Sequence, residues 1–337
     1  MTGAIPTAEV ARDRWGVHMA RASWVLGVVF LVGLGGCRGG EGSGSTDTDG
    51  GTTDGFTGEY ATTADTGTST VELDPDVNTW VPSSWPMEEP PARVIFLGDS
   101  ITVGTGARAD ELDYLSLLLT NDDEVYPAYA GWDLNTMFGD FEAFTSAQGG
   151  ATTETVLDVQ LPALAEALGE QVAGPTLVVG TIGGNDVTNV IFGLQDLAVE
   201  KERIATNMDT IAAFFQDEDR FPDGAMVFLT NVYEPLDGQT SAEECFFGLD
   251  LANIRDDYDA LNERTLELAQ ASGWAWVDLR GHFLGHGHNH DDTEGPFYDA
   301  SDPSLWMNRD CIHPNTRGHH EVRRLFLSAI DNRPLPL

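Results

Sequence analysis

Positive charge is scarce in this sequence. Its 337 residues contain 17 Lys and Arg against 55 Asp and Glu, so the formal net charge is −38 at pH 7, and Lys201 is the only lysine. A chain with this charge is repelled by nucleic-acid phosphates and by anionic lipid headgroups. The composition therefore argues against a nucleic-acid partner and against a polybasic patch that binds membranes.

Long hydrophobic runs are lacking as well. The apolar run at residues 24–34 has 11 residues, about half of what a membrane-spanning helix needs. Arg21 precedes the run, and small residues and then Cys37 follow it, as in an export signal. Residues 34–37, Leu-Gly-Gly-Cys, resemble a bacterial lipobox, in which cleavage before the cysteine leaves its thiol linked to a diacylglycerol. We therefore predict an export signal peptide at 1–36 and lipidation of Cys37; the alternative is an ordinary buried thiol beside an uncleaved anchor.

The first 18 residues fit an export signal poorly. Glu9 and Asp13 are acidic in a region that such signals keep basic. Met19 is therefore a possible true start of translation.

Bulky apolar side chains are nearly absent from residues 38–72. Gly, Ser, Thr and Asp fill 26 of these 35 positions, so the segment cannot bury enough surface to offset the entropy lost on folding. Residues 73–91 contain five prolines and suit an extended lead-in over the domain surface. We assign residues 37–91 to the lipobox cysteine, a flexible tether and this lead-in, and 92–337 to one folded domain.

Cysteine is rare too, with three in the chain. If Cys37 is lipidated, Cys245 and Cys311 remain in a chain that is expected to be exported. Oxidising compartments favour their pairing as a disulfide. Two separate buried thiols are the alternative.

Short apolar runs alternate with helical patterns after residue 91. Gly, Pro or polar turns bound each run, as expected for strands that are buried on both faces of a parallel sheet. The runs are residues 94–97, 176–179, 225–229 and 274–277. The helical patterns are at 155–168, where Pro162 should bend or interrupt the helix, and at 204–215, 258–269 and 316–330. This alternation predicts an α/β fold with three α/β/α layers and a central parallel sheet of about five strands.

Three short segments carry residues suited to acyl-transfer chemistry. Ser100 follows the first strand, where a strand-to-helix turn presents its hydroxyl at the carboxyl edge of the sheet. Asn185 follows the third strand and can direct its amide at a developing oxyanion. Asp310 lies three positions before His313 and can fix the tautomer with which that histidine accepts the serine proton. Each segment also has a purely structural interpretation. Ser100 and Asn185 could cap helices, and the third segment could be a salt-bridged surface loop.

Together these segments resemble the GDSL family of esterases and lipases, also called SGNH hydrolases. The matching blocks are residues 98–100 (Gly-Asp-Ser), 183–186 (Gly-Gly-Asn-Asp), 310–313 (Asp-Cys-Ile-His) and, as the glycine block, 149–153. The resemblance covers about residues 92–332 and implies a flavodoxin-like sheet without a metal or an organic cofactor.

The resemblance also implies a role for each residue. Ser100 would attack the ester carbonyl, His313 would act as general base and then general acid, and Asp310 would orient His313. The oxyanion hole would consist of the Ser100 and Gly150 N–H groups and the Asn185 side chain, with Gly149 as a rival to Gly150. An ordinary α/β-hydrolase elbow is excluded, because Thr102 occupies the position of its second glycine.

A histidine-rich segment, residues 282–292, forms a second conspicuous cluster. Its four histidines and two aspartates have the atoms for zinc ligation, but Gly285 and Gly287 favour a loose loop without fixed ligand geometry. We therefore expect no metal site here, while a substrate contact near the mouth of the site stays open.

The sequence thus predicts an exported serine esterase that hydrolyses a carboxylic ester of a glycan, a lipid or a small molecule. It would act as a monomer, attached through Cys37 to a membrane at the cell surface or in the periplasm. The alternative is a non-catalytic surface module that binds acylated glycans. Such a descendant would be expected to lose a catalytic residue, and none is missing here. Residues 187–200 and 231–250, with Phe192, Tyr233, Phe246 and Phe247, are expected to line the substrate pockets.

Overall fold

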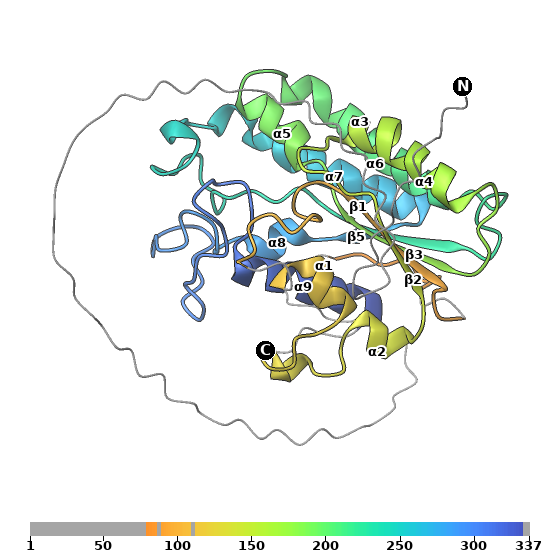
Figure 1. Ribbon diagram of the computed structural model, residues 1–337. Coiled ribbons are helices and arrows are strands. Elements are labelled where there is room, and N and C mark those ends of the chain that lie inside the picture. The colour runs from red at the N-terminus through yellow and green to blue at the C-terminus, as the bar shows by residue number, and fades with distance from the viewer. Residues whose placement is uncertain (1–78, 86–88, 109–111, 333–337) are drawn as a thin grey trace, which may run out of the picture. The chain divides into compact units, whose positions relative to one another are not determined.

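The computed structural model describes residues 79–85, 89–108 and 112–332 (Figure 1). The predicted signal peptide, the possible start at Met19, the predicted lipidation site Cys37 and the tether lie outside the described residues.

The centre of the domain is a five-stranded sheet in which all neighbouring strands are parallel, in the order β2-β1-β3-β4-β5. The strands are β1 Arg93–Gly98, β2 Glu142–Thr145, β3 Thr176–Thr181, β4 Ala225–Thr230 and β5 Ala275–Val277. The predicted parallel sheet of about five strands is therefore confirmed. Because parallel strands end at one edge, the turns after β1, β3 and β4 are brought together there.

Helices cover both faces of the sheet, which confirms the three-layer prediction (Figure 1). One face carries α3 Thr153–Thr155, α4 Leu161–Leu168, α5 Gly184–Ile191, α6 Leu197–Phe215 and α7 Arg255–Ser272. The other face carries α1 Tyr114–Leu119, α2 Leu134–Phe138, α8 Leu279–Phe283 and α9 Thr316–Asp331.

Strand β1 shows how the apolar runs produce these layers. Ile95 and Leu97 pack into the core under α4–α7, whereas Val94 and Phe96 pack under α1 and α9. Successive strand residues point to opposite faces, so a run without polar residues is what a strand covered on both sides requires. All four side chains are fully buried.

Strand β2 has no apolar run and was not located from the sequence. It lies at the edge of the sheet, pairs with β1 alone, and none of its four residues is buried. An edge strand needs little apolar surface, and the sequence Glu-Ala-Phe-Thr therefore has no distinctive pattern.

The helical pattern at 155–168 is interrupted, as Pro162 led us to expect. A π-helical turn, Val156–Gln160, lies between α3 and α4, and Pro162 occupies the first turn of α4. Proline lacks an N–H donor and is tolerated in the first turn of a helix. The interruption places Gln160, which is fully buried, beside the end of β1.

The described part of the predicted lead-in contacts the other edge of the sheet. Trp80 forms an antiparallel bridge with Trp276 of β5 through two backbone hydrogen bonds of 2.8 and 2.9 Å. Trp85 is buried, and its indole N–H donates to the Ile330 carbonyl at 2.6 Å. Among the described helices, none is both long and apolar enough to cross a membrane.

Candidate active site

Ser100 lies in the turn that follows β1. Gly98 ends the strand with φ 119°, and a Cβ atom there would lie 2.0 Å from the Thr181 carbonyl oxygen, so only glycine fits. The Gln160 amide accepts from the Gly98 N–H at 2.9 Å and donates to the Gly98 carbonyl at 2.7 Å. These contacts fix the backbone directly before Ser100. The serine is 8 % exposed, less than a solvent-facing turn residue would be.

His313 and Asp310 complete a hydrogen-bonded chain with this serine. His313 Nε2 lies 2.8 Å from Ser100 Oγ, and His313 Nδ1 lies 2.7 Å from Asp310 Oδ2. Asp310 Oδ1 also accepts from the backbone N–H groups of Ile312 and His313, at 3.0 and 2.9 Å. Partial burial alone would raise the pKa of Asp310, but these hydrogen bonds outweigh it and hold the pKa below its usual value.

The turn that carries Asp310 and His313 is anchored at its centre. Cys311 adopts φ 60°, which is unusual for a residue other than glycine, and is joined by a disulfide to Cys245 with a Cα–Cα distance of 5.6 Å. The Tyr233 hydroxyl donates to the Ile312 carbonyl. The segment after β4, which is far from this turn in the sequence, therefore holds the turn at two points.

Asn308 links the same turn to the serine turn. Its side-chain amide donates to the Pro314 carbonyl at 2.8 Å and to the Gly106 carbonyl at 3.1 Å. The sequence reasoning missed Asn308 and Gln160. Gln160 had a recognisable pattern, because it lies four residues from both Val156 and Leu164 on an apolar helix stripe; Asn308 had none.

Asn185 lies in the first turn of α5, beside the glycine block. Its amide nitrogen donates to the Ala151 carbonyl at 2.9 Å. Gly150, directly before Ala151, has φ 78° and is exposed, whereas Gly149 has no positive φ. Ser100 and Asn185 both line one pocket, which we name the main pocket. Gly150 does not line it.

Asp186 connects the glycine block to α5. This fully buried carboxylate accepts from the Thr153 N–H at 2.8 Å and from the Thr153 hydroxyl at 2.9 Å, and Arg203 lies 3.4 Å away. Burial raises the pKa of Asp186, and the bonds from Thr153 and Arg203 counteract that rise. The contact ties the segment after Gly150 to the residue after Asn185.

The histidine-rich segment is not the loose loop that its glycines suggested. The Asp237 carboxylate accepts from the backbone N–H groups of Gly285, Gly287 and Asn289 at 2.7 to 2.9 Å and so fixes its course. Three hydrogen bonds to one carboxylate therefore hold this segment in a defined conformation.

The four histidines of this segment point to different partners. His282 contacts the buried Glu321 at 3.0 Å, and His286 stacks on Trp306 with ring centroids 3.5 Å apart. Within the described ranges, none of the four lines the main pocket. His288 instead lies beside Cys245 and Cys311. One potential metal-ligand atom of each of these three residues lies within 4.8 Å of the others, but the two sulfurs are bonded to each other in the disulfide.

The aromatic residues expected around the site divide into two groups. Tyr233 and Phe246 line the pocket. Phe192 and Phe247 are 50 % and 94 % exposed and do not line it.

Solved structures similar to this chain include three hydrolases. A phospholipase A1 from Streptomyces albidoflavus is 21 % identical, with a TM-score of 0.46 over 72 % of this chain and 99 % of that one. An extracellular lipase from Streptomyces rimosus is 22 % identical, with a TM-score of 0.45 and the same coverage of 72 % and 99 %. A catalytic mutant of an acetylxylan esterase from Geobacillus stearothermophilus is 17 % identical, with a TM-score of 0.44 over 72 % of this chain and 95 % of that one.

No curated protein matches the chain significantly. The family model that matches it covers residues 96–321, from β1 into α9, and includes the serine turn, the glycine block, the start of α5 and the histidine turn. The chain belongs to the GDSL-like lipase/acylhydrolase family.

Proposed function

We propose that this ester hydrolase uses Ser100 as its nucleophile, His313 as general base and then general acid, and Asp310 as the group that orients His313. The observation that carries the proposal is the continuous chain of contacts of 2.8 Å from Ser100 Oγ to His313 Nε2 and of 2.7 Å from His313 Nδ1 to Asp310 Oδ2. A serine hydroxyl is a weak nucleophile at neutral pH and needs a base within hydrogen-bond distance.

The ionisation of Asp310 determines which nitrogen of His313 carries the proton. Because the pKa of Asp310 is held below its usual value, its carboxylate is ionised at neutral pH and can only accept hydrogen bonds. The neighbouring His313 Nδ1 must therefore carry the proton and donate it. A neutral His313 then has its lone pair on Nε2, the atom that faces the Ser100 hydroxyl.

The reaction proceeds in two halves. Ser100 Oγ bonds to the ester carbonyl carbon while its proton passes to His313 Nε2, and the carbonyl oxygen becomes an oxyanion. Collapse of this intermediate breaks the bond to the alcohol oxygen, which takes the proton from Nε2, and leaves an acyl-Ser100. Water then attacks the acyl group with the same proton transfers, which releases the acid and restores Ser100.

The oxyanion would be stabilised by the N–H groups of Ser100 and Gly150 and by the Asn185 amide. An amide nitrogen has two hydrogens. One of those of Asn185 is donated to the Ala151 carbonyl, so the side chain is oriented and its second hydrogen is left for the oxyanion. Donors fixed before the reaction cost no reorganisation when the charge develops.

The proposal extends to where the enzyme works. The apolar run at 24–34 and the lipobox-like residues before Cys37 support export and attachment of the chain to a membrane through a lipidated Cys37, at the cell surface or in the periplasm. The substrate would be a carboxylic ester of a glycan, a lipid or a small molecule.

Hydrolysis rates of the Ser100→Ala variant test the mechanism. The substrates are p-nitrophenyl acetate, butyrate and a long-chain ester, beside an acetylated glycan. We expect kcat to fall about 10⁴-fold or more on every substrate that the wild type hydrolyses, as for other serine hydrolases. Ser301→Ala, which removes an exposed hydroxyl bonded to Asp299, is the control and should not change kcat. Normal turnover by Ser100→Ala would refute the mechanism.

A further inference from the structure

The pocket beside Ser100 is largely apolar and extends well past the reacting atoms. The space within it, open solvent at its mouth included, is about 820 Å³. Its apolar walls come from α5, the segment after β4 and the start of α7, and include Val187, Ile191, Leu236, Phe246, Leu251 and Tyr258.

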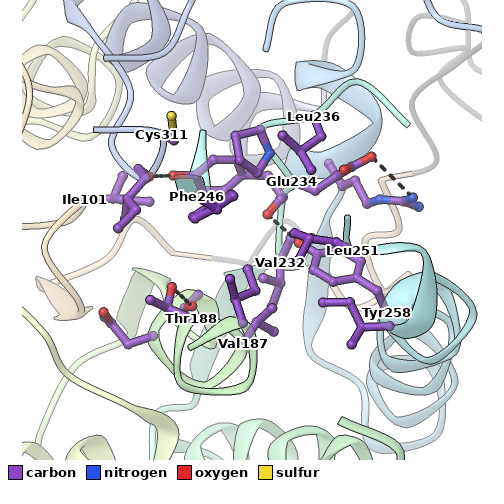
Figure 2. A pocket seen from close by; sticks show the side chains of 18 of the residues that line it. Ile101, Val187, Thr188, Val232, Glu234, Leu236, Phe246, Leu251, Tyr258 and Cys311 are labelled. Atoms are coloured by element: carbon purple, nitrogen blue, oxygen red, sulfur yellow. Dashed lines mark hydrogen bonds and ion pairs between the residues drawn. The ribbon is translucent and has the colours of Figure 1, made fainter. Parts of the chain in front are cut away.

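The pocket becomes polar on the side away from the reacting atoms. Figure 2 shows Ile101 and Cys311, which are next in sequence to Ser100 and Asp310, on one side of the view, and Glu234 and Tyr258 toward the other. Gln239, Arg255 and Arg280 also line the pocket, and Arg280 lies over the Tyr258 ring at 5.5 Å. A purely aliphatic chain would meet charged groups here.

Glu234 is a carboxylate at this side whose charge is only partly compensated by its neighbours. Its Oε1 accepts from the Gly238 N–H at 2.7 Å, whereas Arg280 lies 3.8 Å from that oxygen and is paired more closely with Asp259, at 2.6 Å. No hydrogen bond from the described part of the chain reaches the other oxygen, Oε2. The side chain is 13 % exposed, and Oε2 is open to solvent, which a bound substrate would displace. Burial accordingly raises the pKa of Glu234, and Arg280 offsets part of that rise.

We propose that the arm of the ester bound in this pocket carries a hydroxyl group at its far end, and that Glu234 determines specificity by accepting a hydrogen bond from that hydroxyl. This inference rests on the proposed function, because it assumes that Ser100 attacks the ester. A carboxylate accepts up to four hydrogen bonds and donates none, so a donor on the substrate is what it lacks.

The charges nearby favour a neutral donor over an ammonium group, which Arg280 and Arg255 would repel. A carboxylate has no hydrogen to donate to Glu234. An aliphatic end would cover the carboxylate without replacing its water, which is unfavourable. A hydroxyl group at the end of an apolar spacer fits both the walls and the polar side.

The hydroxyl can belong to the acyl chain or to the alcohol, and paired substrates distinguish the two sources. One set compares p-nitrophenyl esters of straight-chain acids, from hexanoic to octanoic, with their ω-hydroxy counterparts. The other compares butyrate esters of straight-chain alcohols with those of the corresponding terminal diols. The measured quantity is the ratio of kcat/KM within each pair, for the wild type, Glu234→Met and Glu234→Gln.

We expect the wild type to prefer the hydroxylated member about tenfold to a hundredfold in at least one chain length of one set, the range for a hydrogen bond to a charged acceptor. In Glu234→Met the preference should disappear, because methionine has a similar length and no strong acceptor, and plain esters should react faster. Glu234→Gln, which keeps a neutral acceptor, should retain part of the preference. Glu243→Met, at an exposed glutamate nearby, is the control and should leave every ratio unchanged.

Two results would overturn the inference. One is a wild type that hydrolyses the plain esters and prefers no hydroxylated partner in either set. The other is a folded Glu234→Met that keeps the preference; the melting temperatures of both variants show whether they fold, and the wild-type ratios are decisive if they do not. A wild type inactive on every ester, or an active Ser100→Ala variant, would instead refute the proposed function.

Discussion

Asp99, which precedes the proposed nucleophile, is buried and forms no ion pair with any residue that the structure describes. Its Oδ1 accepts from the Thr181 hydroxyl at 2.9 Å and from the Ile101 N–H at 3.0 Å. Burial raises the pKa of Asp99 to about 6, and these two bonds limit the rise. The folded protein therefore binds this proton more tightly than the unfolded chain does.

Asp99 therefore makes the folded protein less stable as the pH rises. Between pH values of about 4 and about 6 the unfolded chain loses the Asp99 proton and the folded protein keeps it, so unfolding becomes easier by roughly 3 kcal/mol as pH rises. Asp99→Asn keeps an acceptor oxygen for Thr181 and Ile101 and removes the ionisation. We expect its free energy of unfolding, measured in urea, to rise relative to the wild type on going from pH 4 to pH 7. A difference between the two proteins that is independent of pH would contradict this account.

Asn185 allows a second test at a single side chain. Asn185→Ala removes one proposed oxyanion donor, and we expect kcat on a short p-nitrophenyl ester to fall about 10²–10³-fold. Asn189→Ala, one turn along α5 at a residue that does not line the pocket, serves as the control. A fall of similar size in both variants would mean that damage to α5 causes the loss.

Single residues differ in how far the sequence predicted them. Ser100, Asn185, Asp310 and His313 lie in short local motifs, and the structure brings Ser100, His313 and Asp310 into one hydrogen-bonded chain. Glu234 could not be recognised, because a glutamate in a loop is ordinary until the fold places it in an apolar pocket.

Among the elements, the histidine turn depends most on long-range contacts. The Cys245–Cys311 disulfide closes a loop with a sequence separation of 66, and Tyr233 holds the same turn through Ile312. Neither the left-handed conformation of Cys311 nor the Tyr233 contact follows from a local pattern, because both arise from packing against the segment after β4.

We expect reduction of this disulfide to lower activity and thermal stability together. A chain-entropy model gives about 4 kcal/mol for a loop of this length, although measured values often fall short, and a displacement of His313 by about 1 Å can cost about 10²-fold in rate. The measurement is kcat and melting temperature before and after reduction, with the Cys245→Ser, Cys311→Ser double variant as the reference. Free alkylation of both thiols in the native, non-reduced protein would show that the bond does not exist.

Burial determines which of the other elements could be predicted from the sequence. The strands β1, β3 and β4 were predicted because each is an apolar run covered on both faces, whereas β2 at the edge of the sheet is short and polar. The interruption of the helical pattern at 155–168 was predicted from Pro162. The contact of Gln160 with Gly98 was not predicted, because it spans 62 residues.

For the whole molecule, the net charge of −38 excludes some partners but identifies no substrate. We predict that the mature protein begins at a lipidated Cys37. A thioether-linked diacylglycerol supplies two or more chains, enough for stable anchoring, where a single chain gives marginal binding. Detergent phase partitioning and mass spectrometry of the N-terminal peptide test this, with Cys37→Ala as the control. Soluble release of a protein with another N-terminus would refute it.

The most direct test of the central claim is covalent labelling of the native enzyme with a serine-directed organophosphate. The account predicts one adduct per chain, located on Ser100 by peptide mass spectrometry, and loss of ester hydrolysis in proportion to labelling. His313→Ala should label far more slowly, because Ser100 loses its base. An adduct on another residue, or full activity after Ser100 is modified, would contradict the account.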